Sequence, residues 1–143
     1  MSSYFRSKVP ANLPRSWEMS TIGHPLSDLV NLMMPYFLKD QTHLNQLPQF
    51  NKGVTPGLPT EEDLLKWYAE VAGWDPSPEL SWGAAFGFFR ATCIYQGIAA
   101  RYAVRQASSA KAKHHGESRH AMARLAWDTL QSAKEAAQGK AKL

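Results

Sequence analysis

The spacing of apolar residues along this chain is mostly that of helices, and no convincing alternating strand pattern appears. After a Gly-His-Pro turn, apolar positions recur three and four residues apart and predict one buried helix face, made by Leu26, Leu29, Val30, Met33, Met34 and Phe37. Pro25 in the first turn, with Ser27 or Asp28 close behind it, is typical of a helix start. Residues 39–59 mix Pro, Gly, Asn and Gln without periodicity and predict a long loop.

A second helix is predicted over residues 60–73. Thr60 and Asp63 are spaced as an approximate capping box, and Gly73 is placed to end the helix. Its predicted inner stripe consists of Leu64, Leu65, Tyr68 and Val71.

The longest predicted helix runs roughly from Glu79 to Ser109. Its first half is apolar almost all round, which is typical of a central core helix. Three small residues spaced four apart form a smooth stripe where another helix can approach closely: Gly83, Gly87 and Ala91. The sequence KAKHHGES then interrupts the pattern, and a last helix is predicted from about Ser118 to Ala137. Its inner rows are Met122, Ala126 and Leu130, flanked by Leu125, Thr129 and Ala133.

The predicted fold class is therefore all-α (mainly helical), with one short strand possible before Trp17. A length of 143 residues with 44% hydrophobic content fits a single globular domain. The net charge of +4 is concentrated in the last third of the chain. A basic helix could contact nucleic acid, but its apolar residues are better explained by core packing, so this reading has the least support. No apolar run approaches the length that crosses a bilayer, so no membrane span is predicted.

Two groups of reactive side chains invite a chemical reading. Cys93 is the only cysteine, so no intrachain disulfide can form, and its apolar surroundings predict a buried structural thiol. A cluster of imidazoles and a carboxylate could suggest a metal site, but it lacks the i, i+4 spacing of a zinc helix. We therefore predict a solvated linker, and no metal site, for the residues of that cluster: His114, His115, Glu117 and His120.

The most specific pattern lies near the start of the chain. Trp17-Glu18, four residues, Gly23-His24-Pro25, two residues and Asp28-Leu29 lead directly into the first apolar helix. This arrangement resembles the aminoglycoside-phosphotransferase-like kinases, whose signature is Asp-Trp-Glu, a short loop, Gly-Asp-Pro or Gly-His-Pro, two residues and Asp-Leu. The form Gly-His-Pro-Leu-Ser-Asp-Leu most resembles the branch fused ahead of acyl-CoA dehydrogenases and its fungal stand-alone relatives.

The resemblance continues through the later helices and covers residues 17–137. It implies the C-terminal half of the large lobe of a protein-kinase-like fold. The family's Mg²⁺-binding Asp directly precedes the Trp-Glu pair, and here that position is Ser16, which cannot supply the carboxylate charge. Asp28 matches an acid that anchors the backbone of the catalytic loop, and His24 stands where many members carry Asp. Glu18 is placed near the phosphate region, without a catalytic role.

The chain also departs from this family. The family's catalytic loop, His-Gly-Asp followed by Asn, should precede the Trp-Glu pair, and the 143 residues contain no His-Gly-Asp. The nucleotide-binding lobe with its phosphate-contacting Lys is missing as well. Phosphoryl transfer depends on positioning and on metal-assisted charge stabilisation. We therefore expect no ATP chemistry and no cofactor for this chain alone, although the family uses ATP and Mg²⁺.

Two functions follow as hypotheses. The first is a truncated or partial small-molecule kinase, with a hydroxylated acid or hydroxyacyl thioester as the substrate class that the resemblance implies. The alternative is a non-enzymatic helical domain that self-associates or pairs with another chain, such as the missing lobe. Its contact surface is predicted to be exposed apolar residues around Trp17, Met33, Met34 and Phe37.

The two ends are predicted to lie outside the folded unit. Residues 1–16 are expected to form an irregular arm, and residues 138–143 a flexible tail. The tail ends in Ala141-Lys142-Leu143, which keeps the small, basic, Leu pattern of a peroxisomal address. The expected location is the peroxisome, with its import receptor as a partner, and the cytoplasm is the alternative.

Overall fold

The computed structural model describes residues 23–41, 44 and 47–140 of the chain. In this part the regular elements are helices alone, and no strand occurs. They are α1 (Leu26–Leu38), η2 (Pro48–Phe50), α2 (Glu61–Ala72), η3 (Ser77–Glu79), α3 (Leu80–Ala103), α4 (Ala112–Glu117) and α5 (Arg119–Lys140). The predicted all-α class is confirmed for the described residues. The strand considered before Trp17 lies outside them.

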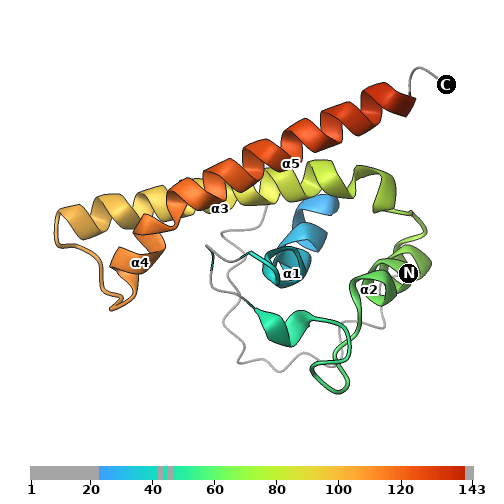
Figure 1. The fold of residues 1–143 in the computed structure, drawn as a ribbon, viewed down its shortest axis with the longest axis horizontal. Coiled ribbons are helices and arrows are strands. Elements are labelled where there is room, and N and C mark those ends of the chain that lie inside the picture. Colours follow the sequence, from blue (N-terminus) through green and yellow to red (C-terminus); the bar gives the residue numbers. More distant parts are fainter. Residues whose placement is uncertain (1–22, 42–43, 45–46, 141–143) are drawn as a thin grey trace, which may run out of the picture.

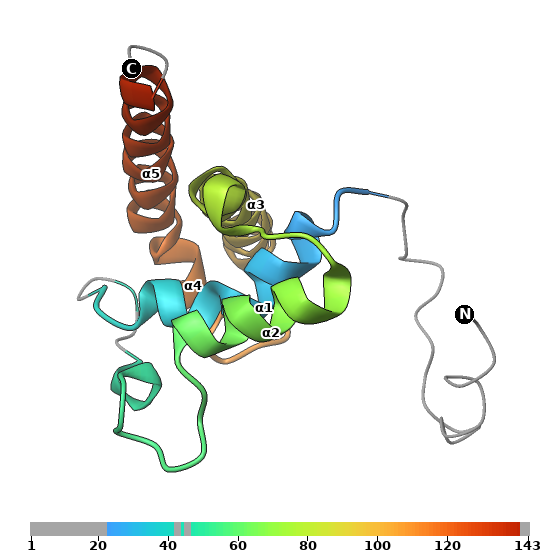
Figure 2. The same ribbon diagram turned by 90° about the vertical axis from the view of Figure 1, so that its right-hand side faces the viewer.

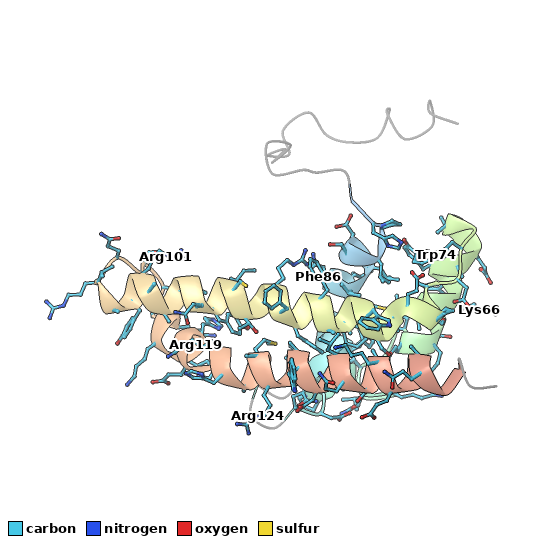
Figure 3. The ribbon with its side chains drawn as sticks, turned by 90° about the horizontal axis from the view of Figure 1, so that it is seen from above. Lys66, Trp74, Phe86, Arg101, Arg119 and Arg124 are labelled. Atoms are coloured by element: carbon cyan, nitrogen blue, oxygen red, sulfur yellow. The ribbon has the colours of Figure 1, made fainter. Side chains whose placement is uncertain are left out.

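The long helix α3 is the centre of the arrangement. α5 runs back along α3 in the opposite direction, and the two lie side by side (Figures 1 and 3). α1 packs on another side of α3, and α2 lies beside α1 (Figure 2). None of the helices in the described ranges is both long and apolar enough to cross a membrane.

Two groups of buried side chains hold these helices together. The first centres on α1 and is covered by partly buried residues of α2 and the chain that follows it: Leu65, Tyr68, Trp74 and Leu80. The second lies between α3 and α5 and consists of Leu44, Ala84, Phe88, Met122 and Ala126. Phe37 packs against both groups and so joins them into one core. Val30 and Met33 are completely buried, which confirms the predicted inner face of α1.

The small-residue stripe of α3 is confirmed as a site of close helix packing. A Cβ atom added at Gly83 would lie 2.7 Å from both Leu26 Cγ and Val30 Cγ1. A Cβ added at Gly87 would lie 3.1 Å from Met34 Cε. The absence of side chains at the two glycines therefore allows α1 to lie directly against the α3 backbone.

The ends of α2 also agree with the prediction. The Asp63 backbone N–H donates to Thr60 Oγ1 at 3.2 Å, and the Thr60 backbone N–H donates to Asp63 Oδ2 at 3.1 Å. The helix ends at Gly73, whose φ of 68° lies in the left-handed region that favours glycine. One member of the predicted inner stripe was wrong, however, because Val71 is 89% exposed. It lies in the last turn of α2, where no neighbouring element covers it.

The C-terminal part of the structure corrects two predicted boundaries. α3 ends at Ala103, six residues before the predicted end, and Arg105 then adopts a φ of 58°. The interruption at KAKHHGES contains the short helix α4, not a solvated linker. Gly116 of α4 lies so close to α3 that an added Cβ would be 3.1 Å from Ala99 Cα. Tertiary contact with α3 therefore stabilises a helical turn that the local sequence does not favour.

The predicted buried thiol was also wrong. Cys93 lies on α3 with its side chain exposed. The sequence of α3 is apolar on almost all of its faces, but not all of these faces are buried, because α1, α4 and α5 leave part of the α3 surface exposed.

Candidate functional site

The start of α1 carries the described part of the Gly-His-Pro motif. His24 Nδ1 accepts a hydrogen bond from the Leu26 backbone N–H at 3.3 Å. The His24 and Trp74 rings pack in a T-shaped arrangement with 5.4 Å between ring centroids, and His24 Nε2 lies 3.9 Å from Glu79 Oε2. His24 is thus oriented by its own helix and by the turn that joins α2 to α3. An imidazole held in this way acts first as a packing and capping group.

Asp28 lies in the first turn of α1, where a carboxylate interacts favourably with the helix dipole. Its side chain is exposed and makes no hydrogen bond or ion pair with another described residue. The neighbouring Ser27 Oγ accepts a hydrogen bond from Arg90 Nη1 at 3.4 Å, which ties α1 to α3. Ser16, Trp17 and Glu18 lie outside the described residues, so the structure does not test their predicted positions.

Beside the start of α1 the surface is hollowed. This hollow, which we call the α1–α3 hollow, has a volume of about 390 Å³. Its lining is mainly apolar and consists of Gly23, His24, Leu26, Ser27, Trp82, Gly83 and Phe86.

A second depression continues from the first across α3 to α5. This α3–α5 groove has a volume of about 370 Å³ and is lined by Trp82, Ala85, Phe86, Phe89, Ala123, Ala126, Trp127 and Leu130. Trp82 and Phe86 line both depressions, so the two form one continuous apolar surface. Phe86 lies in the N-terminal half of α3 (Figure 3). Each depression falls in the size range of small-molecule sites.

The aromatic side chains of the groove are unusually open to solvent. The exposed fractions are 42% for Trp82, 53% for Phe86, 59% for Phe89 and 62% for Trp127. Isolated exposed apolar residues are common on proteins, but a contiguous aromatic patch on two adjacent helices indicates a binding surface.

This surface was not predicted in the right place. The exposed apolar residues were expected around Trp17, Met33, Met34 and Phe37. Trp17 lies outside the described residues, Met33 is fully buried, and Met34 and Phe37 are partly buried against the core. The available signal was the spacing of Trp82, Phe86 and Phe89 at i, i+4 and i+7. These three residues form a second apolar stripe on α3. It has to face something other than α1, which covers the stripe of small residues.

The described residues contain no group of three or more His, Cys, Asp or Glu side chains able to hold a metal ion. His115 lies against Tyr95 of α3 with 5.7 Å between ring centroids. The His114 and His115 rings are 5.8 Å apart. These rings belong to the packing of α4 on α3.

Comparison with known proteins identifies similar sequences. The chain is 34% identical over 112 residues to acyl-CoA dehydrogenase family member 10 of Mus musculus, a match that covers 78% of this chain and 10% of that protein. It is 38% identical over 98 residues to acyl-CoA dehydrogenase family member 11 of Rattus norvegicus, covering 65% of this chain and 12% of the relative. Family member 11 of Gallus gallus is 36% identical over 113 residues.

The chain is thus similar to one short part of these proteins. It spans about a tenth of the length of the curated relatives that it matches. No protein-family model matches the chain, and no solved structure does.

Proposed function

We propose that this chain is the helical part of an aminoglycoside-phosphotransferase-like small-molecule kinase of the hydroxyacyl class, and that it binds ligand without transferring phosphate by itself. The observation that carries the proposal is the sequence similarity to acyl-CoA dehydrogenase family members 10 and 11. It agrees with the resemblance of the Gly-His-Pro and Asp-Leu positions to the branch of these kinases that occurs fused to acyl-CoA dehydrogenases. The α1–α3 hollow and the α3–α5 groove supply an apolar surface suited to an acyl chain.

The absence of phosphotransfer follows from the chemistry of the motif. Ser16 stands where the family has the carboxylate that holds Mg²⁺ on the nucleotide, and a neutral hydroxyl cannot neutralise the phosphate charge through a metal. Of the two other polar side chains of the motif, His24 is engaged with Leu26 and Trp74.

A thermal melt with and without Mg²⁺-ATP tests this part of the proposal. A ligand at a hundredfold excess over its dissociation constant stabilises the folded state by about 2.7 kcal/mol. We expect a cooperative transition whose midpoint is unchanged by Mg²⁺-ATP. A clear rise would contradict the proposal and indicate a nucleotide site assembled from other residues.

The substrate class is tested by the same melt with a medium-chain hydroxyacyl-CoA. Binding of the acyl chain in the α3–α5 groove should raise the midpoint, and Phe89→Asp should remove the rise. The matching free coenzyme A, which has no acyl chain, is the control for binding through the nucleotide portion alone. An equal rise with both compounds would place the affinity outside the groove.

A second candidate function is supported by the open aromatic patch. A non-enzymatic domain that pairs with another chain would cover Phe89 and Trp127, which an isolated domain leaves exposed at a cost in free energy. Assembly that grows with concentration, without any affinity for nucleotide or acyl-CoA, would favour this function over the first.

The location proposed for either function is the peroxisome, through Ala141-Lys142-Leu143. These residues lie outside the described part of the chain. Receptor recognition of such an address requires the free C-terminal carboxylate and the Leu side chain. A fluorescent fusion at the N-terminus should therefore enter peroxisomes, and deletion of Leu143 should leave it in the cytoplasm. Peroxisomal entry that survives the deletion would contradict the proposed address.

A further inference from the structure

We propose that a cleft among α1, α2, α3 and α5 binds a small uncharged molecule that combines an apolar body with an amide group. This four-helix cleft is lined by residues at the end of α1, the start of α2, the first half of α3 and the middle of α5. Its volume of about 320 Å³ falls in the size range of small-molecule sites. The inference does not depend on the activity proposed above, because it concerns a different surface.

The four-helix cleft and the α3–α5 groove lie on different sides of the contact between α3 and α5. Ala84 and Phe88 of α3 line the cleft, whereas Phe86, two positions from each of them, lines the groove. Two positions along an α-helix are about 200° apart around its axis. On α5, Thr129 of the cleft and Trp127 of the groove show the same offset. A molecule in the cleft therefore leaves the groove free.

The floor of the cleft is apolar and belongs to the core. Phe37 and Phe88 pack in a T-shaped arrangement with 6.1 Å between ring centroids, and both line the cleft. Leu80 and Leu125, which also line it, are partly buried against the same core. Side chains that are held by core packing form the apolar surface before a ligand arrives, so a ring or a short chain can bind there at a low cost in ordering.

Three neutral polar side chains converge on this floor from separate parts of the chain. They are Gln41 after α1, Ser81 of α3 and Thr129 of α5, and none of their side chains makes a hydrogen bond with another described residue. The glutamine amide has two donors and a carbonyl acceptor, and each hydroxyl group both donates and accepts. A ligand amide, which also has a donor and an acceptor, can pair with these groups while its apolar body covers the floor.

The charges around the cleft favour an uncharged ligand. Glu61 is the only ionisable residue in the lining, and its Oε2 atom lies 3.9 Å from Lys39 Nζ. Lys39 thus offsets the negative charge of Glu61, so a cationic ligand gains little electrostatic energy there. An anionic ligand would lie beside a carboxylate, which repels it. Glu61 still has a free oxygen that can accept a hydrogen bond from a ligand N–H group.

Three probes with the same ring and different charges test the assigned ligand class: benzamide, benzoate and benzylamine. Each is titrated into the ¹⁵N-labelled full chain, and the backbone amide signals are followed by nuclear magnetic resonance. Benzamide should shift the signals of Gln41, Ser81 and Thr129 along saturable curves, whereas the indole signal of Trp127 in the groove should stay in place. Benzoate and benzylamine should bind at least about tenfold more weakly than benzamide.

Thr129→Val and Thr129→Ser provide a matched pair of variants. Thr129→Val replaces the hydroxyl group with a methyl group of similar size and should weaken benzamide binding several-fold, whereas Thr129→Ser keeps the hydroxyl group and should preserve it. Ser81→Ala is a second test at an exposed position, where loss of the side-chain oxygen leaves the core unchanged. It should also weaken benzamide binding.

Three results would overturn the proposal. Equal affinities for the three probes, or tighter binding of benzylamine, would contradict the uncharged ligand class. Unchanged benzamide affinity in both Thr129→Val and Ser81→Ala would show that these hydroxyl groups do not bind the amide. Shifts at Trp127 without shifts at Gln41, Ser81 and Thr129 would place the probe in the α3–α5 groove and leave the four-helix cleft without a ligand.

Discussion

Gly83 is the residue at which the contact between α1 and α3 is closest. A methyl group there would meet Leu26 and Val30 at 2.7 Å, and both of those side chains are buried. We predict that Gly83→Ala lowers the free energy of unfolding by about 1–3 kcal/mol, the usual cost of overpacking a core. Urea unfolding measures the change.

Gly97 of the same helix is the matched control. The nearest atom to a Cβ added there is Arg101 Nη1 at 3.7 Å, at the end of a flexible side chain. Gly97→Ala should therefore show only the gain in helix propensity, up to about 1 kcal/mol. Equal effects of the two substitutions would mean that α1 does not lie as close to α3 as described.

Asp63 gives the capping box of α2 a dependence on pH. Hydrogen bonds from the Thr60 hydroxyl and backbone N–H, together with Lys52 and Lys66, hold the pKa of Asp63 below its ordinary value of 3.8, although partial desolvation opposes the shift. Because the pKa is lower in the folded state, the stabilisation is complete above the unfolded value and is lost as the pH falls through the folded value.

We therefore predict that Asp63→Asn removes part of the loss of stability that the wild type shows below about pH 4. The measurement is urea unfolding at a series of acidic pH values. Glu62→Gln, at the neighbouring position in the same first turn, is the control and should keep the wild-type acid dependence in this range. An unchanged pH profile in Asp63→Asn would show that the box does not form in solution.

The residues of this box show why local features could be predicted from the sequence. Thr60, Asp63 and Gly73 interact within a single helix, so their spacing alone contains the needed information. Cys93 and Val71 were wrongly expected to be buried, because burial depends on which distant helix lies opposite. A single sequence does not show which helices pack against each other.

At the scale of elements, α1 tests the predicted helix face most directly. Met33 is fully buried and its neighbour Leu32 is 63% exposed. We predict that Met33→Ala lowers the free energy of unfolding by about 2–5 kcal/mol, through lost contacts and a remaining cavity. Leu32→Ala should change it by less than about 0.5 kcal/mol. Chemical unfolding of both variants makes the comparison, and a large effect at Leu32 would contradict the assigned face.

The helices themselves were predicted with different success for a physical reason. α1, α2 and α5 each have an apolar face against the core, so their periodicity shows that they exist and, apart from Val71 of α2, which face is buried. α3 is apolar on several faces, and the pattern could not say which of these remain uncovered. α4 is stabilised by contact with α3 at Gly116 and Ala99, which no local signal reveals.

For the whole molecule, the α3–α5 groove is the surface through which association with a partner or a second copy would occur. If a partner or a second copy covers this surface, sedimentation should show association that increases with concentration. Phe89→Asp should weaken it at least about tenfold, or about 1.4 kcal/mol. Ile94→Asp is the control, because Ile94 is equally exposed on α3 but does not line the groove. Equal weakening by both substitutions would exclude the groove as the contact.

The site could be predicted only in part at this scale. The resemblance indicated His24 and Asp28, and the structure places both at the start of α1. His24 lines the hollow, and Asp28 directly follows Ser27, which also lines it. It could not reveal the groove, because the groove consists of ordinary aromatic residues that become a surface only when α5 lies next to α3.

The central position of α3 has a consequence for how the molecule opens. α1, α4 and α5 each contact α3, and α2 reaches the core mainly through α1. α2 can therefore separate while the α3–α5 pair stays intact, whereas α3 cannot be released without breaking its contacts with α1, α4 and α5. Backbone amides of α2 should exchange their hydrogens with solvent through such partial openings, and those in the middle of α3 only through global unfolding. Hydrogen exchange would thus divide this small helical protein into an early-opening outer layer and a single slow-exchanging axis.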